Sequence, residues 1–215
     1  MTMPVLFQDD ALLVVNKPAG LLSVPGRGPD KQDCLSARVQ RQYADALIVH
    51  RLDMATSGLM LMARGTAVQR VLNHAFYNRR IDKTYVAIVE GHMASAPNDW
   101  GLIDLPIGVD WPRRPLRVID LAQGKPSLTR WRVIGHPPPG VTTPSTRIEL
   151  EPVTGRTHQL RVHLQALGHP ILGDALYASE IVRAKAGRLL LHACTLRFAH
   201  PISGEVLSFS CPPDF

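Results

Sequence analysis

A single carboxylate, Asp53, lies in a turn between two apolar runs, and its position makes it the first candidate for chemistry. Leu47-Ile48-Val49 precedes it and Leu59-Met60-Leu61-Met62 follows it, while Thr56-Ser57-Gly58 is typical of a turn. Turns supported by a rigid sheet often carry catalytic groups, and a carboxylate there can act as a nucleophile. Aspartate also commonly caps backbone N–H groups in turns. The spacing alone leaves both roles open.

A second candidate segment, Thr154 to His163, carries Arg156 and Arg161 at the predicted start of a helix. One guanidinium can pair with a carboxylate and the other with phosphate, and helix N-termini favour anions. An ordinary surface salt bridge is an equally simple role for either arginine. Tyr85 lies in the strand-like run Lys83 to Glu90. Its phenol could stack on a base or transfer a proton, although tyrosines in strands are commonly core residues.

Histidines and cysteines do not form a metal-binding pattern. His158 and His163 are five residues apart, a spacing that does not place both side chains on one helical face. His50 and His192 lie in apolar runs, where a core or supporting role is simpler. The three cysteines are far apart in the sequence, which argues against a disulfide framework and indicates a reducing cytosol. We therefore expect no metal and no cofactor.

The hydrophobic pattern favours an α+β fold with more strand than helix. Thr66 to Arg80 has an amphipathic helical pattern, and a second helix is predicted over Thr157 to Leu167 with Gly168 ending it. A short helix near Leu35 has Asp33 as its predicted N-cap. The strands are predicted at Val5–Phe7, Ala11–Val15, Lys83–Glu90, 125–134, 146–153, 188–198 and 205–211. Residues 135–144 are predicted to be an exposed connection because of their prolines and glycines.

Positive charge is concentrated around Asp53. The net charge is +6, and residues 27–83 hold ten Lys/Arg against five Asp. A second basic segment, Trp111 to Arg117, places a tryptophan beside three arginines. Basic surface with nearby aromatic rings suits RNA, although charge alone also fits a merely soluble surface. No apolar run approaches the roughly 20 residues that span a bilayer, and the N-terminus lacks a basic leader, so we expect a cytoplasmic protein without membrane contact.

Three segments resemble motifs of the RluA family of pseudouridine synthases. The run from His50 to Leu59 resembles the family signature His-Arg-Leu-Asp-x-x-Thr-Ser-Gly-Leu. Residues 155–161 are similar to the Gly-Arg-x-His-Gln-Leu-Arg motif, and residues 83–87 to the Lys-x-Tyr-x-Ala strand. Val15–Arg27, Gly168–Asp174 and Arg188–Ala193 extend the resemblance over nearly the whole chain. Ala19 departs from it, since many relatives carry Ser there.

The resemblance implies roles for particular residues. Asp53 corresponds to the catalytic nucleophile, Arg161 to the arginine that pairs with it, and Tyr85 to the tyrosine under the target base. Leu191 corresponds to an apolar wall of the uracil pocket. Substrate-binding roles are thereby expected at His50, Arg51, Thr56, Arg156, His158, Gln159 and Leu191.

The resemblance further implies one catalytic domain over residues 1–215, without an S4-like RNA-binding module and without an obligate protein partner. Its expected activity is isomerisation of uridine to pseudouridine in RNA, in the tRNA anticodon stem-loop and a 23S rRNA hairpin loop. Three alternatives remain: a synthase acting on only one of these RNAs, a non-catalytic RNA-binding domain, and a glycosidase or nuclease. The last would need a second carboxylate near Asp53, and no nearby motif supplies one. The sequence leaves attack at C1′ or at C6 open.

Overall fold

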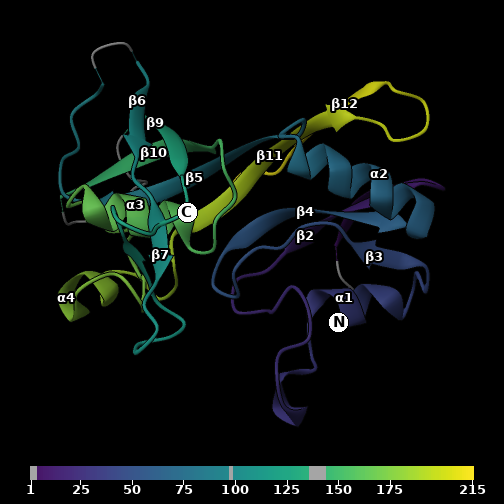
Figure 1. Cartoon of the computed structure of the whole chain (residues 1–215), viewed down its shortest axis with the longest axis horizontal. Coiled ribbons are helices and arrows are strands. Elements are labelled where there is room, and N and C mark those ends of the chain that lie inside the picture. Colours follow the sequence, from purple (N-terminus) through teal and green to yellow (C-terminus); the bar gives the residue numbers. More distant parts are fainter. Residues whose placement is uncertain (1–3, 97–98, 136–143) are drawn as a thin grey trace. The chain divides into compact units, whose positions relative to one another are not determined.

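The computed structural model describes residues 4–96, 99–135 and 144–215 (Figure 1). The chain forms two compact units: unit 1 comprises Met1–Lys83 with Ala193–Pro213, and unit 2 comprises Thr84–His192 with Asp214–Phe215. The chain passes between them within strands β5 (Asp82–Glu90) and β11 (Leu191–Ala199). The expectation of one catalytic domain over the whole chain stays a prediction.

Unit 1 is a sheet with a helix on each face (Figure 1). Its strands lie in the order β1-β2-β4-β11, with β3 also paired to β4 and β12 to β11. The strands are β1 (Val5–Gln8), β2 (Leu12–Lys17), β3 (Ala46–Ile48), β4 (Ser57–Arg64) and β12 (Val206–Ser210). The helices are α1 (Leu35–Gln40) and α2 (Thr66–Tyr77), with a short 3₁₀ turn at Pro29–Lys31.

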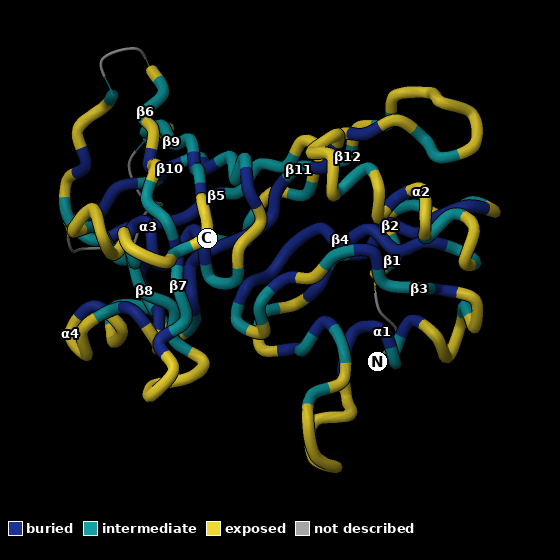
Figure 2. Tube along the Cα trace, viewed as in Figure 1, coloured by how far each residue is buried: buried dark blue, intermediate teal, exposed yellow. Residues whose placement is uncertain are grey.

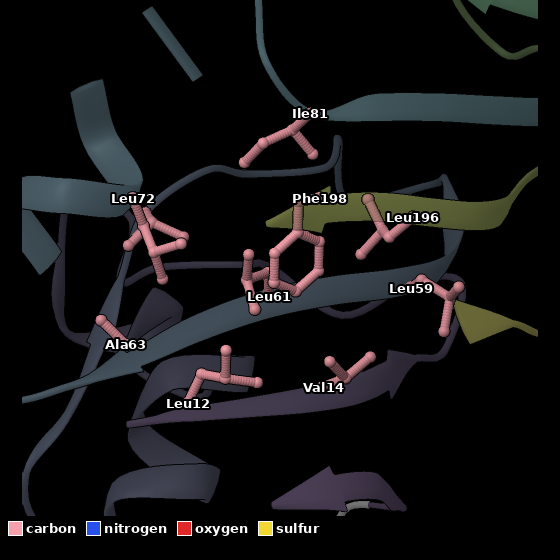
Figure 3. Packing of buried hydrophobic residues seen from close by; sticks show 10 residues of the cluster. Leu12, Val14, Leu59, Leu61, Ala63, Leu72, Ile81, Leu196 and Phe198 are labelled. Atoms are coloured by element: carbon pink, nitrogen blue, oxygen red, sulfur yellow. The ribbon is translucent and has the colours of Figure 1, made fainter. Parts of the chain in front are cut away.

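The core of unit 1 follows from strand alternation. Figure 3 shows Leu12 and Val14 of β2 on the same side as Leu59, Leu61 and Ala63 of β4, which pack against helix α2, Ile81 and strand β11. The intervening residues of both strands, Leu13, Val15, Met60 and Met62, are also fully buried and point to the opposite face of the sheet, on which α1 lies (Figure 1). β2 and β4 are covered on both faces, which explains their continuous apolar runs.

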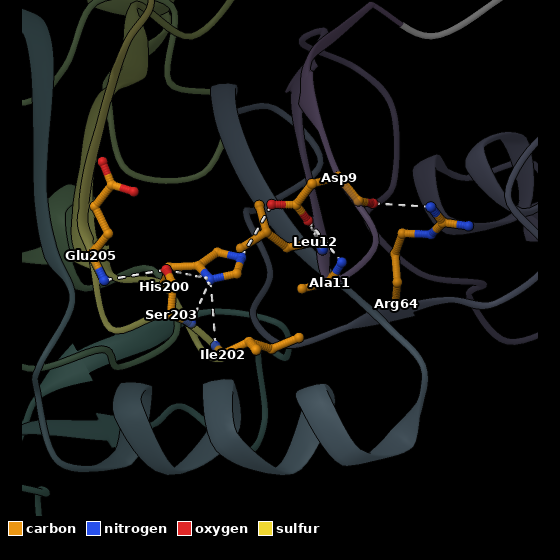
Figure 4. Close-up of polar contacts among 8 residues, drawn as sticks. All are labelled: Asp9, Ala11, Leu12, Arg64, His200, Ile202, Ser203 and Glu205. Carbon is orange, nitrogen blue, oxygen red and sulfur yellow. Dashed lines mark hydrogen bonds and ion pairs between the residues drawn. The ribbon is translucent and has the colours of Figure 1, made fainter.

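A polar network connects three segments at the end of this sheet where the β1–β2 turn lies (Figure 4). Asp9 Oδ1 accepts the N–H groups of Ala11 and Leu12 at 2.7 and 2.8 Å, which forms the β1–β2 turn. Its Oδ2 lies 3.1 Å from His200 Nε2, at the start of the β11–β12 connection. Arg64 Nη1 donates to the Asp9 carbonyl at 2.9 Å. One aspartate therefore joins the N-terminal hairpin, the end of β4 and the C-terminal hairpin.

Unit 2 has an antiparallel sheet in the order β5-β10-β9-β6 and a separate hairpin, β7–β8. Its further strands are β6 (Gly101–Asp104), β7 (Ile107–Val109), β8 (Arg117–Ile119), β9 (Leu128–Gly135) and β10 (Ser145–Pro152). Its helices are α3 (Gln159–Ala166) and α4 (Glu180–Arg183). No helix among the described residues is long and apolar enough to cross a bilayer.

The α+β prediction is confirmed, and most element boundaries differ from it by only a few residues. The N-cap prediction for α1 is wrong: Cys34 Sγ accepts the Ala37 N–H, while Asp33 instead pairs with Arg38. Helix α3 begins two residues later than predicted because His158 adopts a left-handed conformation with φ 57°. Gly168, with φ 80°, follows the helix end as predicted. Most of the predicted connection at 135–144 lies outside the described residues.

Candidate active site

Asp53 lies half-buried in the loop between β3 and β4. The Thr56 N–H donates to the Asp53 carbonyl at 3.1 Å, which closes the turn predicted from the sequence. Thr56 itself is buried, whereas Arg51, two residues before Asp53, is exposed. The structure thus gathers four of the predicted site residues, His50, Arg51, Asp53 and Thr56, on one short loop.

The chain on either side of Asp53 is held by side chains from the N-terminal segment. Ser23 Oγ donates to the Leu52 carbonyl at 2.7 Å and accepts the Leu52 N–H at 3.1 Å. Both backbone polar groups of Leu52 are therefore satisfied by one buried hydroxyl. This contact fixes the residue immediately before Asp53.

Lys17 fixes the residue immediately after Asp53. Its fully buried ammonium donates to the carbonyls of Pro18, Leu21 and Met54 at 2.8, 2.8 and 3.1 Å. Burial lowers the pKa of Lys17 from 10.5 to about 8, and the negative charge of Asp53 opposes that lowering. Lys17 thus supplies a positive charge to the Asp53 environment as well as three hydrogen bonds.

His50 contacts Leu61 and Phe76 within unit 1. Its Nε2 accepts the Leu61 N–H at 2.9 Å, and its ring stacks on Phe76 with centroids 4.6 Å apart. Burial, together with the charge of Lys83, lowers the pKa of His50 to about 3. The imidazole is therefore neutral and its acceptor nitrogen is used within unit 1, which favours positioning of the Asp53 loop over a charged contact with substrate.

Gly58 is required where the Asp53 loop enters β4. Its φ is 116°, and a Cβ at this position would lie 2.3 Å from the Ala193 carbonyl oxygen. Any larger residue would push β4 away from the beginning of β11. The glycine of the Thr-Ser-Gly run is thus explained by close backbone packing.

In unit 2, Arg161 forms a buried ion pair with Asp174. Its Nε and Nη2 donate to the two carboxylate oxygens at 2.7 and 2.6 Å, and the side chains are 4% and 0% exposed. Asp174 Oδ1 also accepts the N–H groups of Leu176 and Tyr177. The guanidinium orientation is therefore fixed from within unit 2. The expected pairing of Arg161 with Asp53 stays a prediction.

Tyr177 lies beside Arg161 and contacts His158. The Arg161 guanidinium lies 5.1 Å from the centre of the Tyr177 ring. The Tyr177 hydroxyl shares a 2.6 Å hydrogen bond with His158 Nδ1. His158 thus connects to Arg161 through a tyrosine that the sequence did not single out.

Gln159 uses both ends of its amide inside unit 2. Its Oε1 accepts from Thr154 Oγ1 and the Arg156 N–H, and its Nε2 donates to the Leu128 carbonyl and Thr129 Oγ1. These four hydrogen bonds use both ends of the side-chain amide, and only 3% of the residue is exposed. Gln159 therefore positions the start of α3. We regard this as the better hypothesis than the substrate contact expected from the sequence.

The remaining predicted residues lie at different depths in unit 2. Tyr85 is half-buried on β5, opposite Leu150 of β10. Leu191 is buried at the start of β11, and Arg156 is exposed just before α3. Three positioning residues, Lys17, Ser23 and Asp174, had no predicted role, although all lie in segments that carried the resemblance.

Among the described residues, no group of three or more His, Cys, Asp or Glu side chains is arranged so that it could hold a metal ion. His163, one of the two histidines considered for a metal, is buried with Nδ1 2.9 Å from Thr129 Oγ1 and Nε2 2.9 Å from the Leu105 carbonyl. Both of its nitrogens thus have partners within unit 2.

Comparison with known proteins gives consistent matches. A family model described as RNA pseudouridylate synthase matches residues 11–166. The dual-specificity RNA pseudouridine synthase RluA of Yersinia pestis is 49% identical over 213 residues, covering 99% of this chain and 100% of that protein. The RluA of Escherichia coli K12 is 49% identical over 211 residues, covering 98% and 93%. The structure of human RNA pseudouridylate synthase domain containing 1 has a TM-score of 0.81 at 31% identity, covering 99% of this chain and 84% of that one.

Proposed function

The chain belongs to the RluA family of RNA pseudouridine synthases, and from this premise we propose that it isomerises uridine to pseudouridine in RNA. The observation that carries the proposal is the placement of Asp53, within the matched region, on a turn whose two neighbouring residues are fixed by Ser23 and Lys17. Attack on a sugar carbon requires a nucleophile that is held in a fixed position, and these contacts fix the chain on both sides of Asp53.

The reaction can be written with Asp53 attacking C1′ of the target uridine. The C1′–N1 bond breaks and its electron pair leaves with the uracil. The uracil turns, its C5 forms a bond to C1′, and the carboxylate is released. The proton on C5 is lost and N1 gains one, so the overall change is an isomerisation without a redox step. Attack at C6 is the alternative first step.

We assign supporting roles to four further residues. Tyr85 stacks on the base and transfers the proton, since a phenol offers both an aromatic face and an O–H group. Arg161 stabilises and aligns the Asp53 carboxylate, with its own orientation fixed by Asp174. Arg51 and Arg156, both exposed, are proposed to contact RNA phosphates.

The proposed substrates are a tRNA anticodon stem-loop and a 23S rRNA hairpin, and the proposed location is the cytoplasm. The support for the two substrates is that the relatives of Yersinia pestis and Escherichia coli are dual-specificity RNA pseudouridine synthases. A uridine in a loop is also easier to flip out of its stack than one in a duplex.

The test uses the purified full chain with the two hairpins, each labelled with tritium at uridine C5. Release of tritium from both, followed by mapping of pseudouridine to one loop position in each, is the expected result. Modification of only one hairpin would replace dual specificity by a single-substrate synthase. Binding of both without tritium release would identify a non-catalytic RNA-binding protein.

A further inference from the structure

The loop between β7 and β8, residues 110–116, is a pre-formed basic projection of unit 2, and we call it the Trp111 loop. The Asp110 N–H donates to the Leu116 carbonyl at 3.2 Å, and the Leu116 N–H donates to the Arg113 carbonyl at 3.0 Å. Asp110 Oδ1 accepts the Arg113 N–H, and Oδ2 accepts Arg113 Nε at 2.7 Å. These local bonds hold the loop in one conformation before any ligand binds.

The base of the hairpin is anchored beside α3. Ile107 of β7 packs with Val162 of α3 and with Tyr177, and Leu116 and Ile119 join this cluster. The Arg117 N–H donates to the Tyr177 hydroxyl at 2.9 Å. Since Tyr177 also contacts Arg161, the Trp111 loop and the proposed site residue Arg161 are supported by the same side chain.

The loop presents an aromatic ring and positive charge to solvent. Trp111 is 66% exposed, and the loop following β7 is exposed throughout residues 111–115 (Figure 2). The Arg114 guanidinium lies 5.0 Å from the Trp111 ring centre, and its Nε donates to the Trp111 carbonyl at 3.1 Å. Arg113 is 72% exposed. An exposed tryptophan on a fixed loop is typical of a binding site.

We propose that the Trp111 loop binds an unpaired base of the RNA substrate, other than the uridine that is isomerised. The base stacks on Trp111, and the guanidinium groups of Arg113 and Arg114 contact the adjacent phosphates. Aromatic rings flanked by cations are a common way to hold single-stranded nucleic acid. The inference rests on the proposed function for the identity of the ligand as RNA. It gives unit 2 a recognition role separate from the chemistry.

Trp100 provides a matched control. Its ring lies beneath Arg130 and Arg132, with centroid distances of 4.5 and 4.7 Å, much as Trp111 lies beneath Arg114. Those arginines are paired with Glu151 and Glu149, each at 2.6 Å. Arg113 of the Trp111 loop is likewise paired with Asp110 at 2.6 Å, so the excess positive charge of that loop comes from Arg114. The Trp100 surface has the aromatic–arginine contact without such an excess, and it should not attract phosphate.

The experiment is a double-mutant cycle between Trp111→Ala and single abasic sites placed at each loop position of the RNA hairpin. Affinity is measured by fluorescence anisotropy at constant salt. Trp111→Ala should weaken binding about ten-fold, as expected for loss of one stacked base. One abasic position should weaken binding of the wild type by a similar factor and have little effect on the variant. Trp111→Phe should restore most of the affinity, and Trp100→Ala should leave it unchanged.

Two results would overturn the inference: wild-type affinity in Trp111→Ala, or equal losses at every abasic position in both proteins. The thermal unfolding midpoint of Trp111→Ala should match the wild type because the side chain is exposed, so weaker binding will not reflect misfolding. Failure of the proposed function appears differently, as absence of tritium release from the wild type. Coupling between Trp111 and one base would then still establish the binding surface.

Discussion

At the scale of single residues, the proposed reaction depends on Asp53 being a carboxylate. Asp53→Asn keeps the shape of the side chain and removes the nucleophile and its charge. We expect single-turnover tritium release below about one-thousandth of the wild-type rate, with RNA affinity changed by only about a few-fold. Measurable turnover above that level would refute the nucleophilic role of Asp53.

Asp174 is predicted to act through Arg161. Asp174→Asn removes the carboxylate that pairs with the buried Arg161 guanidinium within unit 2, and breaking a buried ion pair typically costs about 3–5 kcal/mol of stability. We expect a clear decrease in the urea midpoint and, under conditions where the variant is folded, a slower single-turnover rate with RNA affinity retained.

The control for Asp174 is Asp33→Asn, which removes a partner of Arg38 on the exposed surface. Exposed pairs contribute little, so its urea midpoint and rate should match the wild type. Equal effects of the two substitutions would show that the buried Arg161–Asp174 pair has no special role.

At the scale of elements, the segment that follows β2 holds the Asp53 loop in place. Lys17→Met keeps the length of the buried side chain but removes the ammonium donor from the carbonyls of Pro18, Leu21 and Met54. The Met54 carbonyl keeps the Gly20 N–H as a donor at 2.8 Å. The bond to the Leu21 carbonyl is buried, and an unsatisfied buried acceptor costs about 1–3 kcal/mol. We predict a reduced single-turnover rate and stability with RNA affinity nearly unchanged. Lys31→Met, at an exposed position of the same segment, is the control, and a wild-type rate in Lys17→Met would contradict the prediction.

Two buried histidines should make the fold acid-sensitive. Burial lowers the pKa of His50 to about 3 and lowers that of His163, whereas both side chains regain an ordinary pKa near 6.5 on unfolding. The unfolded chain therefore binds more protons below about pH 6.5, and stability falls as the pH decreases through this range. For His50 the loss continues down to about pH 3.

Urea unfolding measured between neutral and acidic pH tests this dependence. The slope of the unfolding free energy against pH is proportional to the number of protons taken up on unfolding. His50→Gln should decrease that number by up to about one. His74→Gln, a substitution on the exposed surface of α2, should leave the slope unchanged. An unchanged slope in His50→Gln would mean that His50 does not remain neutral in the folded protein.

Helix α2 could be predicted from its periodic pattern, whereas the three shortest strands of unit 2 could not. Helix α2 begins at the predicted Thr66 and ends three residues before the predicted Arg80, because Arg79 takes a left-handed conformation. Strands β6, β7 and β8 were not predicted, since three or four residues carry too little alternation to be recognised. The cap at Cys34 was missed because a thiol is an uncommon N-cap and Asp33 a common one.

The candidate site could be predicted where a motif contains the residue and not where the role depends on tertiary contacts. Asp53 and Arg161 were identified from their motifs. Lys17 acts through Met54, 37 residues away, and Asp174 acts through Arg161, 13 residues away. In the further segments that carried the resemblance, a role at the site was assigned only to an apolar residue, Leu191. No local sequence pattern indicates that a lysine or an aspartate will be fully buried.

At the scale of the whole molecule, positive charge is concentrated in one part of the sequence. Of the ten Lys/Arg in residues 27–83, Arg38 and Arg64 are paired with Asp33 and Asp45, and Lys83 is half-buried. The others are exposed: Arg27, Lys31, Arg41, Arg51, Arg70, Arg79 and Arg80. These are the groups of this segment that can replace counterions on RNA phosphates.

RNA affinity should consequently decrease steeply with salt. A short hairpin can contact only some of the seven exposed basic residues, and about three to five phosphate contacts would give a slope of log K against log salt between about −2 and −4. Titrations of one hairpin at several salt concentrations measure this slope. Replacing Arg51, next to the Asp53 turn, by Gln should make it shallower by about one contact, or about 0.7 to 0.9. The same substitution at Arg38, already paired with Asp33, should leave the slope unchanged. A flat response in the wild type would mean that the basic residues of this segment do not face the RNA, and recognition would then depend on contacts made by unit 2.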